Sequence, residues 1–258
     1  MIRLFFCCSF LAILACAPRG DAQSRQQKLT PEEVHQQQAQ RTSTFNSLAG
    51  RGIIEFHWSD EDGKHRAQGD FDFWRTANQI SIRVSKSGEP LLWIGGDETN
   101  HWLFDMLGDE TTLTINQKDF IFSDAKDTLV LLGLAPLPKG STSIDQGVVT
   151  VKTTNGVWVA TFEPSTYRPL EIAFQNEEHH VSAIHQSGIK VALPQKNRLV
   201  WPETGKLIDI ESTTSQARVK IDFDWLSIDT SDEPMNKVFD LEYLQQALRP
   251  TIVIGSTQ

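Results

Sequence analysis

Histidines are the first residues of this 258-residue chain that could do chemistry, because imidazole is a common zinc ligand. His179, His180 and His185 form a cluster. Neighbouring strand residues point to opposite faces of a sheet, so His179 and His180 are poorly placed to share one ion. The sequence has no His-Glu-x-x-His segment, and its three cysteines lie within the first 16 residues. We expect these histidines to lie on the surface and predict no metal site.

Two further patterns are too loose to indicate catalysis. Asp60–Gly63 resembles the start of a calcium loop but lacks the later ligands and the closing glutamate. Ser187–Lys190 fits Ser-x-x-Lys without the partner motifs that accompany it in enzymes. Paired carboxylates of a glycoside hydrolase need no local motif, so a hydrolase with unidentified acids stays open as an alternative. We predict no catalytic residue and no cofactor.

Aromatic residues that alternate with polar residues are the remaining candidates for a binding site. Side chains at every second position share one face of a strand. In one interpretation they fill a core. In the other, a curved sheet of many strands is too wide to be filled and keeps an apolar cavity suited to an acyl chain. The candidate lipid-binding residues of this cavity are Phe56, Trp58, Phe71, Phe73, Trp102, Phe104, Phe223 and Trp225.

Short strands joined by turns must position these aromatic residues. From Leu48 onward, apolar residues recur at every second position, and turn residues such as Asp62-Gly63 and Asn155-Gly156 separate the segments. Because several connections are only a few residues long, we expect antiparallel pairing. The pattern predicts a single domain that is mainly β, in the α+β class.

A few helices are expected beside the strands. Thr30-Pro31-Glu32-Glu33 has a capping threonine, a proline suited to the first helical position, and a glutamate three residues after the cap. The first helix is expected to reach about Phe45. Two more are predicted over Asp124–Leu134, with Ser123 as its cap, and over Asp240–Arg249, with Asp240 as its cap.

The N-terminus has the parts of a secretory signal. The apolar run Leu4–Ala17 follows a positive charge and is too short to span a bilayer. Two processing routes compete. Gly20-Asp21-Ala22 suits cleavage before Gln23, whereas Ile13–Cys16 resembles a bacterial lipobox in which Cys16 is lipidated. We expect an exported protein, either periplasmic or lipid-anchored to the envelope and facing the periplasm.

Charge restricts the partners. With 24 basic and 33 acidic residues the formal net charge is −9, and no basic stripe is present. Such a chain repels phosphate backbones, so we expect no nucleic-acid partner, and membrane contact only through an N-terminal lipid anchor. The predicted organisation is a signal peptide over 1–22 (or 1–15 before a lipidated Cys16), a spacer over 23–29, one domain over 30–250, and a tail over 251–258.

Local segments and the order of elements resemble the bacterial LolA-like superfamily, which contains periplasmic lipoprotein carriers, their lipid-anchored acceptors and related envelope proteins. The segments that carry the resemblance are Phe45–Gly50, Trp93–Asp97, Trp102–Asp105 and Phe239–Pro250. The resemblance implies an incomplete antiparallel β-barrel whose concave apolar face holds lipid or acyl chains. It also implies lid helices, for which Ser123–Leu134 and Phe239–Arg249 are the candidates.

Three functions follow as hypotheses. The first is a non-catalytic envelope protein that binds lipid or lipoprotein acyl chains in an apolar barrel cavity, with a role in lipoprotein or lipid trafficking. The second is an interaction or sensor module with a filled core that binds an envelope protein partner. The third is the hydrolase with unidentified carboxylates.

Overall fold

The computed structural model describes residues 30–45, 47–97, 99–116, 125–190, 203–214, 216–228 and 237–256. The expected signal peptide with Cys16, the spacer and the Ser123 cap lie outside these residues. Within the described part of the chain, every helix is too short or too polar to cross a membrane.

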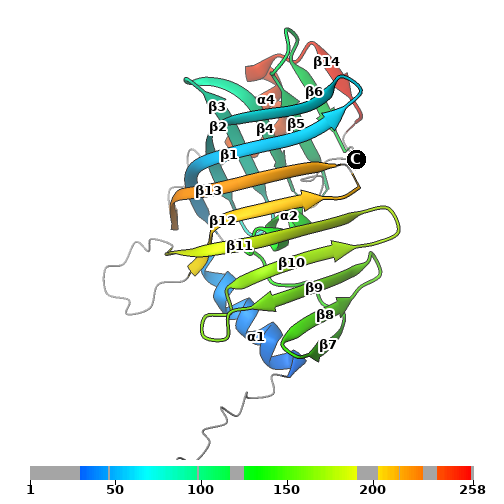
Figure 1. Cartoon of the computed structure of the whole chain (residues 1–258). Coiled ribbons are helices and arrows are strands. Elements are labelled where there is room, and N and C mark those ends of the chain that lie inside the picture. The colour runs from blue at the N-terminus through cyan, green and yellow to red at the C-terminus, as the bar shows by residue number, and fades with distance from the viewer. Residues whose placement is uncertain are drawn as a thin grey trace, which may run out of the picture.

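Fourteen strands of the described chain form one strongly curved sheet that does not close (Figure 1). Their order across the sheet is β14-β6-β5-β4-β3-β2-β1-β13-β12-β11-β10-β9-β8-β7. The strands are β1 (Leu48–Asp60), β2 (Gly63–Arg75), β3 (Ile80–Lys86), β4 (Glu89–Gly96), β5 (His101–Asp105), β6 (Thr112–Ile115), β7 (Ser141–Asp145), β8 (Val148–Lys152), β9 (Val157–Phe162), β10 (Pro169–Gln175), β11 (His180–Lys190), β12 (Glu203–Ser212), β13 (Ala217–Ile228) and β14 (Ile252–Ile254).

Strand pairing follows the turn signals of the sequence. Neighbours in the sheet pair antiparallel, except that β14 pairs parallel with β6. Asn155-Gly156 forms the loop between β8 and β9, and Gly156 has a positive φ of 153° that a glycine adopts readily. The two edge strands, β7 and β14, were not expected, and β14 lies in the stretch predicted to be a tail. The sheet is therefore the incomplete antiparallel barrel that the resemblance implies.

Alternation along the strands gives the sheet two different faces. The inner face carries the main hydrophobic core, with buried residues such as Phe73, Ile82 and Ile94 that lie opposite one another on β2, β3 and β4. The outer face carries the residues between them, such as Asp72 and Arg83. The face that a side chain occupies therefore decides whether it can contribute to a site on the concave side of the sheet.

The helices lie on both faces. Helix α1 (Pro31–Thr42) has the predicted capping box between Thr30 and Glu33, and the short turn η1 (Ser43–Phe45) follows it. Helix α2 (Ala125–Leu131) packs with its buried leucines in the main core. Both α1 and α2 lie behind the sheet in Figure 1, on its inner face. Two of the expected helices thus cover the face that the resemblance assigns to lids.

Helix α4 (Leu241–Leu248), capped by Asp240 as predicted, packs on the opposite face. Its residue Leu244 belongs to a second core with Trp102 and Phe104 of β5. Phe104 pairs with Trp93 of β4 and therefore points away from the neighbouring Ile94, which lies in the main core. The expectation that this helix covers the concave face is wrong, because α4 covers the outer face instead.

A bulge shapes the contact between β1 and β13. Arg51 pairs with Trp225 and Gly52 with Phe223, so Asp224 is an extra residue. A Cβ atom at Gly52 would lie 1.9 Å from the backbone oxygen of Asp222 and 2.9 Å from Cε1 of Phe71. A glycine is therefore required where the two backbones approach most closely.

We expect Gly52→Ala to lower the free energy of unfolding by about 1–3 kcal/mol, because the added methyl group forces the two strands apart. Urea denaturation measures this change. Gly108→Ala is the matched control, since a Cβ atom at Gly108 meets no atom within 4 Å. Equal stabilities of the two variants would contradict the close approach.

Candidate functional site

Four of the eight candidate aromatic residues lie on the inner face. Phe56, Phe71, Phe73 and Phe223 are buried in the main core. The ring of Phe223 makes edge-to-face contacts with Phe71 at 5.3 Å and with Phe73 at 5.8 Å between ring centroids. Strands β1, β2 and β13 are neighbours in the sheet, so the alternation of each strand places all four rings on the same face.

Trp58 lies on the same face but near the end of β1. It is partly buried against the main core, and its ring stacks on His65 of β2 with 5.2 Å between centroids. This residue therefore extends the aromatic surface of the inner face toward solvent.

The other three candidates lie on the outer face. Trp102 and Phe104 are buried beneath α4, and Trp102 lines an outer cleft of about 500 Å³ together with Phe239. Trp225 is 43% exposed, because the bulge at Asp224 shifts the alternation of β13 by one residue. The expectation that all eight residues line one cavity is wrong, since the sheet separates these three from the rest.

A short leucine-rich segment, residues 125–138, covers the inner face; we call it the α2 plug. It contains α2 and the turn that follows. Its buried apolar side chains pack against the inner face, and five of them are Leu129, Leu131, Leu132, Leu134 and Leu137. The plug therefore occupies the space that the sheet encloses.

Gly133 ends the helix of the plug. Its φ of +66° is in the left-handed region, and the Leu134 amide donates to the Leu129 carbonyl at 2.8 Å while the Gly133 amide donates to the Val130 carbonyl at 2.8 Å. This is the Schellman arrangement, for which glycine is the preferred residue. The next carbonyl groups of the plug must find partners elsewhere.

Four successive carbonyl groups of the plug accept hydrogen bonds from side chains of four other elements. Each donor is buried, and together they tie the plug to α1, β2, β11 and β12. The pairs are His185 Nε2 to the Leu131 carbonyl at 2.8 Å, Thr204 Oγ1 to the Leu132 carbonyl at 3.5 Å, Arg41 Nη2 to the Gly133 carbonyl at 2.6 Å, and Arg75 Nη1 to the Leu134 carbonyl.

The two arginines suit this position because the C-terminal end of a helix carries partial negative charge. Burial, and then the nearby Arg168 and Arg75, lower the pKa of Arg41 to about 9. Burial lowers the pKa of Arg75 to about 10. Both groups remain charged at neutral pH. The inner face therefore holds positive charge next to the plug.

His185 is also part of this arrangement, although the sequence predicted a surface residue. It is 4% exposed because it lies on the inner face of β11, two residues from the buried Ala183. A carbonyl oxygen only accepts, so Nε2 carries the hydrogen in the bond to Leu131. Burial lowers the pKa of His185 to about 4, despite this hydrogen bond, which raises it. The imidazole is therefore neutral in the folded protein at pH 7.

A cleft of about 790 Å³ runs beside the plug. The plug forms one wall, α1 contributes Ala39, and the sheet contributes residues from β9 and β10. Much of the lining is apolar, including Leu129, Val130, Leu137, Trp158 and Phe174. The ring centroids of Trp158 and Phe174 are 4.7 Å apart, so the two side chains are in contact. These two aromatic residues were not among the eight candidates, and no feature of the sequence marks them as cleft residues, because both occur in ordinary alternating strands.

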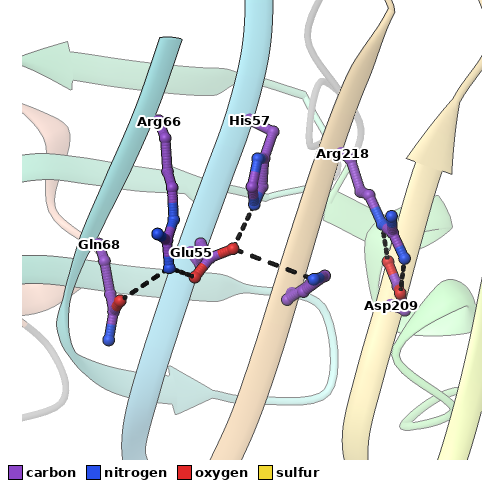
Figure 2. Close-up of polar contacts among 7 residues, drawn as sticks. Glu55, His57, Arg66, Gln68, Asp209 and Arg218 are labelled. Carbon is purple, nitrogen blue, oxygen red and sulfur yellow. Dashed lines mark hydrogen bonds and ion pairs between the residues drawn. The ribbon is translucent and has the colours of Figure 1, made fainter.

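The outer face near β1 is polar and ionic (Figure 2). The carboxylate of Glu55 accepts hydrogen bonds from Arg66 at 2.5 Å and from His57, and Lys220 lies 4.0 Å away. The hydrogen bond from Arg66, followed by that from His57, lowers the pKa of Glu55 to about 2. Arg218 and Asp209 form a two-bond ion pair on the next strands. These charges neutralise one another on a solvated surface, which separates this face from the apolar cleft.

Solved structures share this fold. A domain named as an outer membrane lipoprotein-sorting protein, from Vibrio parahaemolyticus, has a TM-score of 0.50 and 10% identity and covers 81% of this chain and 97% of its own. A DUF1329 family protein from Desulfovibrio piger has a TM-score of 0.51 and 9% identity and covers 83% and 98%. A LolA superfamily protein from Nitrosomonas europaea has a TM-score of 0.48 and 10% identity and covers 81% and 99%. No family model and no curated protein matches the sequence. The first two structures show that this chain shares their fold, which agrees with the fold expected from the resemblance in the sequence.

We expect stability to fall by about 2 kcal/mol between pH 7 and pH 5 because of His185. The unfolded chain protonates this histidine near its ordinary pKa of 6.5, whereas the folded protein resists protonation down to about 4. The stabilisation is therefore present above pH 6.5 and is lost as the pH falls toward 4. Urea denaturation at several pH values measures it. His185→Gln keeps a donor for Leu131 and should remove this pH dependence, and an unchanged slope in the variant would disprove the assignment.

Proposed function

We propose that this chain is an exported, non-catalytic envelope protein that binds lipid or lipoprotein acyl chains on the inner face of its sheet. The observation that carries the proposal is the cleft of about 790 Å³ beside the α2 plug, whose apolar lining continues into the main core. Its volume lies within the range of about 300–1,000 Å³ that is typical of small-molecule sites. Burial of an acyl chain there would contribute about 0.8 kcal/mol for each methylene group.

The plug supports a second step of this proposal. It covers the inner face with a helix of only seven residues. If the plug moves away from the sheet, the acyl chain gains contact with Phe56, Phe71, Phe73 and Phe223, and Trp58 stands at the rim. These five residues are the proposed lipid contacts in the opened protein. Trp102, Phe104 and Trp225 take no part, since they lie on the other face.

The compartment and the role extend the same proposal. The N-terminal signal directs the chain out of the cytoplasm, either as a periplasmic protein or anchored through a lipidated Cys16. The neighbour from Vibrio parahaemolyticus is named for outer membrane lipoprotein sorting, which favours a role in lipoprotein or lipid trafficking. A LolA-like fold also favours binding over catalysis.

A second candidate function is binding of an envelope protein partner by the outer face. Ile53, Leu207 and Trp225 are each about two-fifths exposed on β1, β12 and β13. Ile53 and Leu207 both pair with Asp222, so they lie near each other on that face. Exposed apolar side chains that form a contiguous patch are typical of protein interaction surfaces. This function is compatible with lipid binding on the inner face.

We expect Ala39→Trp to reduce lipid binding, because Ala39 is an exposed residue of α1 that lines the cleft and an indole there excludes part of an acyl chain. Loss of three buried methylenes corresponds to about 2.4 kcal/mol, or roughly fiftyfold in affinity. The full chain is exported to a bacterial periplasm, purified without detergent, and analysed by native mass spectrometry before and after incubation with envelope lipid extract.

Gln37→Trp is the matched control, because Gln37 is also exposed on α1 but lies on another side of the helix. We expect the wild-type protein and Gln37→Trp to carry bound lipid and Ala39→Trp to lose it. A wild-type protein that carries no lipid even after incubation would refute the proposed function. Equal lipid binding by all three proteins would place the lipid elsewhere.

A further inference from the structure

The charges that line the cleft differ from those of the chain as a whole. The chain has a formal net charge of −9. The cleft, in contrast, is lined by three cationic side chains and two carboxylates, which are Arg75, Lys126, Lys139, Asp97 and Asp127. A net positive rim on an acidic protein indicates that the cleft favours an anionic ligand.

The carboxylates of the cleft are already engaged. The Oδ1 atom of Asp97 accepts from the Thr99 amide at 2.7 Å, from the Thr99 hydroxyl at 2.8 Å and from the Asn100 amide at 2.8 Å. Asp127 also has an interaction of its own. The neutral donors stabilise the Asp97 carboxylate without cancelling its charge, so the cleft has three cationic side chains against two anionic ones.

The lysines of the cleft are differently placed. Lys126 lies in the first turn of α2, and Lys139 follows directly after the plug, so they mark its two ends. Both are exposed, and among the described residues neither has an ion-pair partner. Arg75, on the wall of the cleft, uses Nε and Nη1 for the carbonyl groups of Thr76 and Leu134. The cleft therefore combines an apolar lining with two ammonium groups that a ligand can reach.

From this combination we infer that the cleft selects an anionic amphiphile, whose acyl chain lies along Leu129, Trp158 and Phe174 while Lys126 and Lys139 hold its anionic head group. The inference rests on the proposed function and adds the class of ligand to it. The shared chemistry is one anionic group at the end of an acyl chain. Its source is either the carboxylate of a free fatty acid or the phosphate of an anionic phospholipid.

Two ligand pairs with matched chains test the inference by displacement of the uncharged fluorescent probe N-phenyl-1-naphthylamine from the full chain. Palmitic acid is compared with 1-hexadecanol, and phosphatidylglycerol with phosphatidylcholine. We expect the anionic member of at least one pair to bind about tenfold more tightly, and less so at high salt. The double variant Lys126→Gln/Lys139→Gln should lose this preference but keep its affinity for 1-hexadecanol.

Lys64→Gln/Lys86→Gln is the matched control, since it removes the same charge from exposed lysines outside the cleft. A preference for palmitic acid assigns a carboxylate head group, and a preference for phosphatidylglycerol assigns a phosphate. Equal affinities within both pairs, or a preference that survives in the Lys126→Gln/Lys139→Gln variant, would overturn the inference while lipid binding stands. Failure of every ligand and of the probe to bind would overturn the proposed function as well.

Discussion

The buried hydrogen bonds to the carbonyl end of α2 are the constraint on which the rest of the structure depends. A curved sheet of fourteen strands encloses more space than its own side chains fill, so another segment must enter it. A helix that enters brings unpaired carbonyl groups into the core, where each would be costly without a donor. Donors from α1, β2, β11 and β12 meet this requirement. They connect residues that are up to 92 positions apart in the sequence, as with Arg41 and Gly133.

Two kinds of interaction therefore hold the plug, and they differ in how specific they are. The leucines supply apolar burial, which is strong but has no direction. The carbonyl groups accept from Arg41, Arg75 and His185, and these bonds fix one orientation of the plug. An acyl chain can replace the apolar contacts of the plug with contacts of its own. In the proposed function it does not replace the hydrogen bonds, so the loss of these bonds would oppose opening and set the affinity that a ligand needs.

Local patterns predicted most of the elements of the fold, but not the faces of the sheet. The Thr30 capping box, the Asp240 cap and the turn at Asn155-Gly156 are satisfied by neighbouring residues, and all three are present. Alternation shows that Trp102 and Phe104 share a face of the sheet. It does not show whether that face is the inner or the outer one, because residues on both faces recur with the same period of two. The bulge at Asp224 likewise depends on pairing with β1. The hydrogen bonds of Arg75 and His185 with the plug depend on the three-dimensional packing alone, so no local pattern of residues predicts them.

The two faces of the sheet also differ in the partners of their charged side chains, and this difference affects which ligand the cleft favours. On the outer face, carboxylates such as Glu55, Asp72 and Asp209 are paired with arginines, so positive and negative charge cancel in water. On the inner face, Arg41 and Arg75 bind carbonyl groups, which are dipoles and leave the full positive charge of each guanidinium in place. Such charge is felt more strongly in an apolar interior than on a wet surface. The cleft of this acidic chain is thus lined by three cationic side chains against two carboxylates, and the inferred anionic amphiphile would match both its apolar lining and this excess of positive charge.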